Sequence, residues 1–368
     1  MVSVMVDPSF SKSIWCISMY DGLVAQLKLK RLSFQVVDSL EQLDPGSRFL
    51  FLIGADNTWV HSALEKANEL GVYPILLCNE AYHTSSFDYS TVCSDVIGSM
   101  LHAVESLRQM NRHRIALYGI NPQSIADQGR LEAYLAAVDK DQSHIFYNNG
   151  SLEKCYQEFM EFSAGMDSDF DAIICANSLT AISMIRRLLV EDPKRLDKLL
   201  IFGYQEVRLS ALYDRYFHTI QLNFDEYGKA AVMILDNLRK NSNISHMIIA
   251  IKWDNTVVDN LRGKRKKHRE GTEPDRSLPN PGDAFYEDNE INEMMLLEKL
   301  LYESEDLDKQ IVRHLLEGDS YEQIAEKSYL TVSTVKYRVK KMVSHCRLNN
   351  RSQLLELLRR YIPEGSTF

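Results

Sequence analysis

The sequence predicts an α/β protein that ends in a small all-α domain, and three observations carry this prediction. Short apolar runs alternate with amphipathic helical patterns over residues 13–258, which is typical of parallel sheets covered on both faces. Residues 259–282 are basic and then rich in Pro and Gly, which indicates a linker. After residue 283 the apolar side chains recur only at helical spacing.

The α/β region, which we place at residues 11–258, contains short apolar runs that we predict as strands. They are Ile14–Met19, Phe34–Val37, Phe49–Ile53, Tyr73–Cys78, Arg114–Tyr118, His144–Tyr147, Ala172–Cys175, Leu199–Phe202 and His218–Leu222. The clearest helical patterns lie between them, at Trp59–Leu70, Asp95–Met110, Asp127–Val138, Leu179–Leu189 and Asp225–Leu238. Only about a dozen residues precede the first predicted strand, so we expect a DNA-binding domain at the opposite end of the chain.

The strand–helix junctions carry a family resemblance. In order, they are His113–Ala116, Gln128–Arg130, Asp171–Asn177, Ile201–Gln205, His218–Phe224 and Tyr227–Ala231. This succession resembles the effector-binding region of LacI-type regulators. The resemblance implies two lobes of the type I periplasmic-binding-protein fold, with a ligand cleft between them at the carboxyl ends of the strands.

When the family's ligand positions are transferred to this sequence one residue at a time, the resemblance implies ten ligand contacts, of which all but one are polar. They are Tyr20, Asp21, Asp56, Asn57, Asn79, Asp95, Arg130, Asn177, Gln205 and Leu222. Arg130 is the preferred contact because a guanidinium can grip hydroxyl pairs or a carboxylate, and its alternative is a salt bridge between lobes. Asn177 is either a ligand contact or a helix N-cap. Ser178 and Leu222 stand where the family has an Asp and a polar residue, so an ordinary monosaccharide is disfavoured, or the cleft has changed its use.

The C-terminal residues 304–368 carry the most specific pattern in the chain. Gly318 is placed to end one helix and Ser320 to cap the next. Ile324-Ala325 would pack inward, and Thr331 would cap a third helix. The apolar positions of that helix are Val332, Val335, Val339, Met342 and Val343. These elements predict three short helices around a common core.

The pattern resembles the LuxR-type helix-turn-helix, which has Gly, Ile-Ala, Thr-Val-Lys and Asn-Arg at these separations. The family's opening Leu-Thr-x-x-Glu is absent near Ser304, and Ser328 replaces a core Leu. From Thr331 to Arg347 there are five Lys or Arg and no acid, which suits a helix in the major groove. The DNA contacts expected are Thr331, Ser333, Thr334, Lys336, Tyr337, Lys340, Lys341 and Arg351. A solvated face or a partner-binding surface is the alternative.

The segment 283–303 predicts an amphipathic connecting helix. Its apolar stripe consists of Ile291, Met294, Met295, Leu297, Leu300 and Leu301. A helix with such a stripe needs a partner. It would pair with its twin in a dimer or dock on its own helix-turn-helix domain.

Composition and charge are consistent with a regulator. The 368 residues are 45% hydrophobic and 25% charged, which is enough for two or three domains. The net charge is −9, but residues 319–361 hold nine Lys or Arg against four acids. That segment therefore carries +5 and the remainder −14, as expected of an acidic sensor joined to a basic DNA-reading end.

Other features narrow the class of protein. The six cysteines show no C-x-x-C pair and lie within apolar runs, so we predict buried free thiols. No apolar run reaches membrane-spanning length, and the first thirty residues do not have the pattern of a signal peptide. A cytoplasmic location is therefore expected. We find no catalytic constellation, metal-ligand spacing or phosphate loop, and so predict no enzyme activity, metal or cofactor.

Together these observations predict a one-component transcription regulator. Its C-terminal helix-turn-helix would bind double-stranded DNA, and its cleft would sense a small molecule such as a sugar or a related metabolite. A homodimer is expected because two recognition helices can read a pseudo-palindromic site. The alternative is a non-enzymatic binding module with an empty or repurposed cleft, whose C-terminal helices engage a partner protein.

Overall fold

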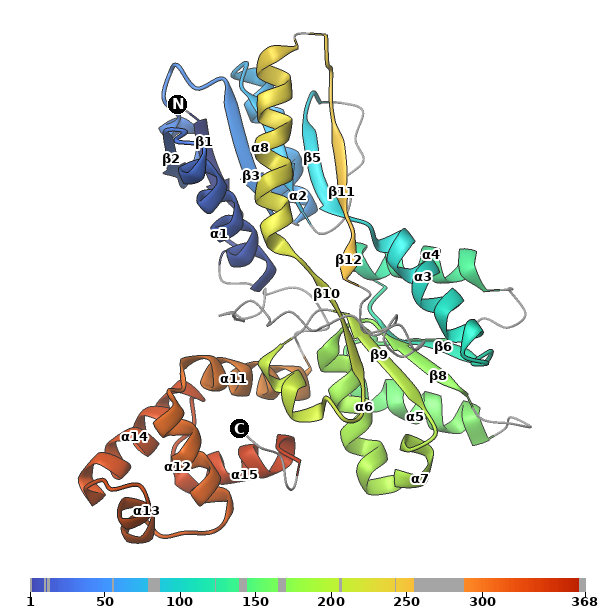
Figure 1. Cartoon of the computed structure of the whole chain (residues 1–368), viewed down its shortest axis with the longest axis vertical. Helices are drawn as coiled ribbons and strands as arrows, with labels where there is room; N and C mark the ends of the chain where they lie inside the picture. Colours follow the sequence, from blue (N-terminus) through green and yellow to red (C-terminus); the bar gives the residue numbers. More distant parts are fainter. Residues whose placement is uncertain are drawn as a thin grey trace. The chain divides into compact units, whose positions relative to one another are not determined.

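A computed structural model describes residues 2–254, apart from 10, 12–13, 55, 79–86, 123, 139–143, 165–169, 205–206 and 242, and residues 288–363. The chain divides into two compact units (Figure 1). The first comprises Met1–Arg112, Pro122–Ser143 and Ile220–His268, and the second comprises His113–Asn121, His144–Thr219 and Arg269–Phe368. The C-terminal helices therefore belong to the second unit. The predicted linker at 259–282 lies outside the described residues.

The first unit contains a six-stranded sheet with the order β11-β5-β4-β3-β1-β2. Each pair of neighbouring strands is parallel. The strands are β1 (Val2–Val6), β2 (Phe34–Val37), β3 (Phe49–Ile53), β4 (Tyr73–Leu77), β5 (Ser90–Ser94) and β11 (Ile248–Ile251). Because β1 lies between β2 and β3, the first residues of the chain occupy the interior of the sheet.

The helices of this unit are α1 (Ile14–Leu29), α2 (Asn57–Glu69), α3 (Val96–Gln109), α4 (Ile125–Ala137) and α8 (Phe224–Lys240), with a 3-10 helix η1 (Leu40–Gln42). Helices α1, α2 and α8 contact the sheet, and α3 and α4 pack against each other. Helix α2 packs through Leu64 against Leu50 and Leu52 of β3, which project to one side of the strand. Helices α1 and α8 pack against each other, and α8 also contacts β4 and β5. Covering helices are what fully buried parallel strands require.

One predicted element is wrong. Ile14–Met19 is not the first strand but the first part of the 16-residue helix α1. Trp15, Cys16 and Met19 are buried in this helix, so its apolar run reflects burial and not extended backbone. The true first strand is β1, which precedes the predicted domain start at residue 11. Segment length distinguishes a buried strand from a buried helix, because buried strands span only about 4–8 residues and α1 spans 16.

Helices α1 and α8 approach each other at two glycines. A Cβ atom on Gly228 would lie 2.2 Å from the carbonyl oxygen of Gly22, and a Cβ on Gly22 would lie 2.8 Å from the carbonyl oxygen of Phe224. Both obstacles are backbone atoms, which cannot rotate away as a side chain could. The crossing therefore requires that both residues lack a side chain.

We predict that Gly228→Ala will destabilise the first unit by about 1–3 kcal/mol, because the added methyl group overpacks a backbone contact. Urea unfolding followed by circular dichroism measures this change. The matched control is Lys229→Ala on the next, exposed position of α8, which should change stability by less than about 0.5 kcal/mol. Equal stability of the two variants would contradict the close crossing.

The second sheet has the strand order β12-β10-β9-β8-β6-β7. The strands are β6 (Ile115–Ile120), β7 (His144–Tyr147), β8 (Ala172–Cys175), β9 (Leu200–Tyr204), β10 (His218–Leu222) and β12 (Trp253–Asp254). Strands β7, β6, β8 and β9 are parallel, and β12 is antiparallel to β10. Five predicted strands have the predicted bounds, namely β2, β3, β7, β8 and β10. The α/β prediction is confirmed.

The helices of the second unit include α5 (Leu152–Ala164), α6 (Ser178–Glu191), α7 (Pro193–Leu196) and the 3-10 helix η3 (Arg208–Tyr213). An aromatic core forms where β6 and β7 meet α5. In it the rings of Tyr118 and Phe159 lie 5.9 Å apart and those of Phe146 and Phe159 lie 5.3 Å apart, both edge to face. Such pairs add to the stability gained from apolar burial.

Five helices end the chain: α11 (Asn289–Glu303), α12 (Asp306–Leu316), α13 (Tyr321–Lys327), α14 (Val332–His345) and α15 (Arg351–Tyr361). The all-α prediction for this region is confirmed. All six cysteines are buried and none forms a disulfide bond, as expected. Within the described part of the chain, no helix combines the length and apolar character needed to cross a membrane.

Candidate nucleic-acid interface and ligand site

The turn that leads into α13 has the predicted capping residues. Gly318 follows α12 with a φ of 90°, a conformation that glycine adopts without steric penalty. Ser320 then caps α13: its Oγ accepts from the Gln323 amide at 3.3 Å, and the Gln323 side chain accepts from the Ser320 amide at 2.8 Å. This reciprocal capping box fixes where the helix begins.

Helix α14 presents two different faces. Its N-cap is Thr331, whose Oγ1 accepts from the Thr334 amide at 3.2 Å. Val335, Val339, Met342 and Val343 are buried. The opposite face exposes Ser333, Lys336, Tyr337, Lys340 and Lys341, and Tyr337 is 70% exposed. The division into a packed face and an exposed cationic face is the one that the sequence predicted.

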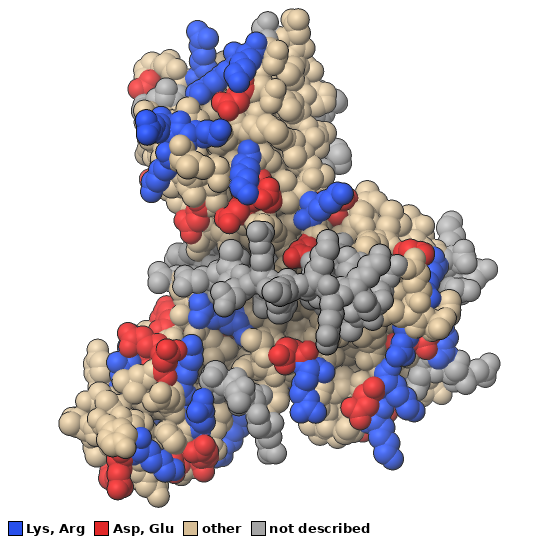
Figure 2. All heavy atoms as spheres, in the orientation of Figure 1, with Lys and Arg blue, Asp and Glu red and all other residues tan. Residues whose placement is uncertain are grey.

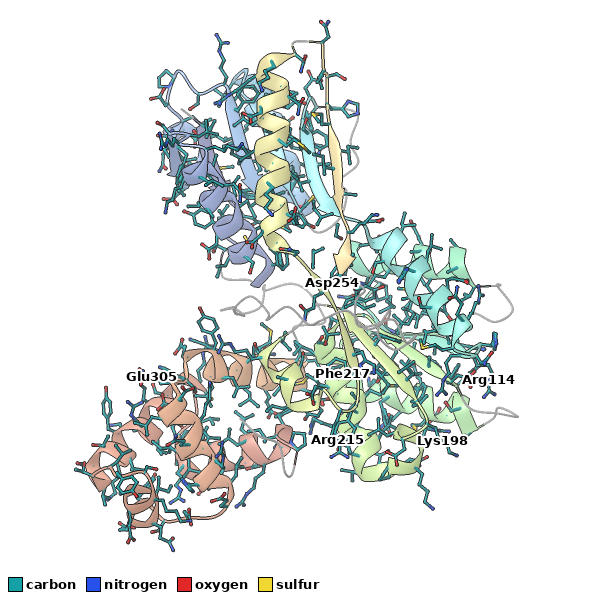
Figure 3. All side chains as sticks on the ribbon, viewed as in Figure 1. Arg114, Lys198, Arg215, Phe217, Asp254 and Glu305 are labelled. Carbon is teal, nitrogen blue, oxygen red and sulfur yellow. The ribbon has the colours of Figure 1, made fainter. Side chains whose placement is uncertain are left out.

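Two cations near α14 have structural partners that the sequence did not reveal. Arg338 donates to Asp308 at 2.9 Å and to Glu305 at 3.2 Å. Glu305 stands at the start of α12 (Figure 3). Arg351 donates to the backbone carbonyl of Asp319 at 2.7 Å, and its guanidinium lies 4.6 Å from the centre of the Tyr321 ring. In this structure Arg351 therefore supports the turn before α13, so a DNA contact would have to be made in addition to this role.

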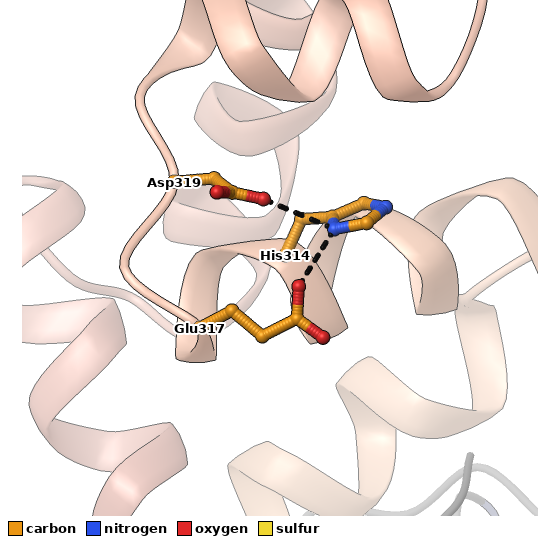
Figure 4. A group of neighbouring side chains, drawn as sticks. All are labelled: His314, Glu317 and Asp319. Carbon is orange, nitrogen blue, oxygen red and sulfur yellow. Dashed lines mark hydrogen bonds and ion pairs between the residues drawn. The ribbon is translucent and has the colours of Figure 1, made fainter.

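A compact ionic cluster joins α12 to the following turn. His314 Nδ1 lies 3.0 Å from Glu317 Oε2 and 3.1 Å from Asp319 Oδ2 (Figure 4). The same Asp319 oxygen also accepts from Lys327 Nζ at 2.6 Å, and this hydrogen bond lowers the pKa of Asp319. Because a lysine ammonium already satisfies the carboxylate, the cluster is an ion-pair network that closes the turn.

The first unit places its predicted ligand residues in different ways. Tyr20 and Asp21 do not follow a strand: both lie in the middle of α1, which corrects their expected position. Asp56 and Asp95 do stand at strand exits, where each caps a helix by accepting from the amides of Trp59 and Gly98. Asn57 is the first residue of α2, and Asn79 lies outside the described residues.

Asp7, which the sequence reading missed, occupies the true exit of the first strand. Its side chain is fully buried and accepts from the amides of Ser9 at 2.9 Å and Asp56 at 3.3 Å. Burial raises the pKa of the Asp7 carboxyl. The sequence signal for Asp7 is the apolar run Val2–Val6 immediately before it, which has the length and composition of a short strand. Asp7 and Asp56 are the two polar residues that the structure brings together here.

Arg130 is buried in α4, where its Nη1 donates to Asp127 Oδ1 at 2.8 Å. Both side chains are less than a tenth exposed. This ion pair is formed within one helix, three residues apart, a pairing that helical geometry favours. Removing the arginine would therefore leave a buried carboxylate, which makes Arg130→Ala unsuitable as a test of ligand binding alone.

In the second unit, Asn177 is a helix N-cap. Its Oδ1 accepts from the Thr180 amide at 3.0 Å and from the Thr180 hydroxyl at 2.9 Å. Of the two roles expected for Asn177, ligand contact and N-cap, the structure contains the N-cap. Leu222, which belongs to the first unit, is a buried apolar residue of β10. Gln205 lies outside the described residues, directly after β9.

The connecting helix α11 has partners on both sides within the second unit. Ile291, Met294, Leu297, Leu300 and Leu301 are buried and Met295 is half-buried. The helix contacts α6 and η3 beside the sheet, and also α14 and α15. Of the two arrangements expected for this helix, packing on the C-terminal helices of its own chain is the one observed, and packing on the sheet-bearing part of the unit was not predicted.

Acidic side chains of α11 make the polar contacts of this junction. Glu298 is 6% exposed, and its two oxygens accept from the amides of Arg208 at 2.6 Å and Leu209 at 2.8 Å, at the start of η3. Asp288 caps α11 and also accepts from the amide of Leu152, the first residue of α5, at 2.6 Å. Glu303 pairs with His345 of α14 at 2.8 Å.

Arg186 of α6 joins three of these elements. It forms an ion pair with Glu290 of α11 and donates from Nε to the carbonyl of Arg360 at 2.8 Å. Its guanidinium also lies 4.2 Å from the centre of the Tyr361 ring in α15. Arg187 completes the site by donating to the second oxygen of Glu290 at 2.6 Å. The C-terminal helices are thus attached to the second unit by charged, largely buried contacts.

No family model matches the chain, and no curated protein matches it either. Solved structures do. A transcription regulator from Lactobacillus plantarum is similar over 69% of this chain and 97% of its own, with 16% identity and a TM-score of 0.51. A LacI-family regulator from Rhizobium etli is similar over 68% of this chain and 95% of its own, with 11% identity and a TM-score of 0.53. A periplasmic solute-binding protein from Actinobacillus succinogenes with bound D-allose is similar over 70% of this chain and 99% of its own, with 18% identity and a TM-score of 0.51. At these identities the likeness establishes the fold, which is that of the type I periplasmic-binding proteins and LacI-family regulators.

Proposed function

We propose that this protein is a one-component transcription regulator that binds double-stranded DNA through α14 and responds to a small molecule. The observation that carries the proposal is the division of α14 into a buried apolar face and an exposed face with Lys336, Lys340 and Lys341. A capped helix of this kind, on a short helix-turn-helix scaffold, can enter the major groove. The LuxR-type pattern of residues 304–368 points to the same role.

The distribution of charge supports this interface. Figure 2 shows Lys and Arg together with Asp and Glu on the visible face of the C-terminal helices, so the region as a whole is not uniformly basic. Arg338 is held by Glu305 and Asp308. The cations left exposed on α14 are the three lysines, which can neutralise phosphates while Ser333 and Tyr337 lie nearer to the bases.

Ligand sensing is the second part of the proposal. The solute-binding neighbour holds D-allose, and the shared fold supports an effector of similar size, such as a sugar or a related metabolite. Asp56, Asp95 and Asn177 stand at strand exits, where this fold places ligand contacts. Asn79, Arg130 and Gln205 complete the set that we propose.

Contacts within the second unit support a connection between the proposed ligand contacts and the proposed DNA-binding helices. Helix α6 begins at its cap Asn177, a proposed ligand contact, and carries Arg186 and Arg187, which bind α11. Strand β9 leads through Gln205 to η3, which Glu298 of α11 caps. A ligand that prefers one arrangement of these elements would shift the reader by its difference in affinity. In a homodimer that shift would alter the spacing of two readers.

We predict that Lys336→Ala combined with Lys340→Ala will weaken duplex DNA binding about 10- to 100-fold at low salt, because two phosphate contacts are lost. The slope of log K against log salt should become shallower by about 1.8. Fluorescence anisotropy across a salt series measures both quantities. The matched control is Lys28→Ala with Lys30→Ala, which removes two exposed cations from the first unit and should leave both quantities unchanged.

Two outcomes would contradict the DNA interface. One is unaltered affinity and salt slope in the Lys336 and Lys340 variant. The other is a wild-type chain whose DNA retention does not respond to salt, since phosphate binding always releases counterions. The second outcome would favour a module whose C-terminal helices engage a partner protein.

A further inference from the structure

Tyr329 occupies a backbone position that normally belongs to glycine. It lies in the turn between α13 and α14 and has a φ of 55°. Its amide donates to the carbonyl of Glu326 at 3.3 Å, and the Leu330 amide donates to that of Ala325 at 2.8 Å. These two bonds define a Schellman motif, in which the residue just past the helix adopts the left-handed conformation.

The same motif ends α12, and there the chain uses glycine. The Gly318 amide donates to the carbonyl of Leu315 at 3.1 Å, and the Asp319 amide donates to that of His314 at 3.0 Å. Gly318 has a φ of 90°. Helix α14 ends in the same motif at Arg347, which has a φ of 53°. Three successive helices of the candidate reader therefore end in the same way, and only α13 does so with a bulky aromatic residue.

The Tyr329 side chain gains nothing from packing within the chain. It is 97% exposed, more than any other large apolar side chain in the described part of the protein. Arg31, Asn111 and Arg347 also have a positive φ, but among these residues only Tyr329 combines it with an exposed aromatic ring. That combination has no compensation inside the fold. Such departures are expected where a residue serves binding.

The surroundings of Tyr329 indicate what it binds. It precedes the N-cap of α14 by two residues, at the end of the recognition helix that would lie nearest to the duplex. The exposed face that follows contains Tyr337 and three lysines, and the segment from Thr331 to Arg347 has no acid. A tyrosine beside such a cationic face suits the backbone of a nucleic acid. The phosphates can accept a hydrogen bond from the hydroxyl, and the sugar offers an apolar surface to the ring.

We propose that Tyr329 contacts the DNA backbone, with its hydroxyl donating to a phosphate oxygen and its ring lying against a deoxyribose. This assignment rests on the proposed DNA-binding function. A backbone contact is favoured over a base contact because Tyr329 stands outside α14, and in this motif the helix itself enters the groove. Tyr329 would therefore contribute to affinity for any duplex and not to the choice of sequence.

The test compares Tyr329→Gly and Tyr329→Phe with the wild-type chain, using a duplex selected by the wild-type protein from a random library and a scrambled duplex. We expect Tyr329→Gly to bind both about 10-fold more weakly and Tyr329→Phe about 3-fold more weakly, since one hydrogen bond corresponds to roughly this factor. The melting temperature of Tyr329→Gly should not fall, because glycine fits the backbone.

Arg31→Gly is the matched control. Arg31 is exposed, has a φ of 53° and follows α1 in the same hydrogen-bonding motif. The Arg31→Gly variant should bind both duplexes with the affinity of the wild-type chain. The inference is overturned if Tyr329→Gly binds as well as the wild type, if its melting temperature falls, or if only the selected duplex is affected. A wild-type chain that binds neither duplex would instead refute the proposed function.

Discussion

Glu298→Ala is expected to destabilise the second unit by about 3–5 kcal/mol. The carboxylate is nearly buried and accepts from two backbone amides of η3, those of Arg208 and Leu209. Each hydrogen bond to a charged group contributes about 1.5–3 kcal/mol, and an amide left buried without a partner adds its own penalty. Glu290 of α11 also accepts two hydrogen bonds from this part of the unit, but they come from the side chains of Arg186 and Arg187 and not from backbone amides.

Urea unfolding and amide hydrogen exchange together measure this effect. The amides of Arg208 and Leu209 should exchange faster in Glu298→Ala, and Glu298→Gln, which keeps one acceptor oxygen, should be intermediate. Glu158→Ala, at an exposed position of α5, is the control and should change stability by less than about 0.5 kcal/mol. A loss below about 1 kcal/mol in Glu298→Ala would show that the cap is not needed.

Arg186→Ala is expected to destabilise the attachment of α11 and α15 by about 2–4 kcal/mol. The substitution removes the ion pair with Glu290, the bond to the Arg360 carbonyl and the contact with the Tyr361 ring. Glu290 is only 11% exposed and would keep Arg187 alone, so part of its charge would be buried without a partner. Losing one member of a buried pair is costly for that reason.

Hydrogen exchange over α11 and α15, together with urea unfolding, reports on this prediction. Arg186→Lys should be intermediate, because an ammonium keeps the charge but lacks the planar fork that reaches three partners at once. Lys194→Ala, an exposed change in α7, provides the control. If exchange in α15 is the same in Arg186→Ala and the wild type, Arg186 does not hold the C-terminal helices.

The sequence predicted the C-terminal helices in detail because the signals for their ends and buried faces are local. Ser320, Thr331 and Asn350 cap helices in the structure, and each cap is set by residues within one turn. The buried positions of α14 follow from spacing along a single helix. The hydrogen bonds of Arg338 and Arg351 could not be predicted in this way. Their partners lie 30 and 32 residues away in the chain, and the spacing of residues along one helix does not reveal such contacts.

The errors near the N-terminus have a different cause. Ile14–Met19 is apolar because α1 is buried against α8, and a short apolar run does not distinguish a buried helix from a strand. Placing the first strand there also displaced the proposed contacts Tyr20 and Asp21 and hid Asp7. The junction made by Glu298 and Arg186 was equally out of reach, since its partners lie 89 to 174 residues apart in the chain.

The position of β1 has a practical consequence for anyone who expresses fragments of this protein. Starting a fragment at residue 11, where the sequence suggested that the domain begins, would delete the strand that joins β2 to β3. The remaining edge of β3 would expose unpaired amides and carbonyls, which favour aggregation. Fragments intended for crystallisation or ligand screening should therefore retain Val2–Val6.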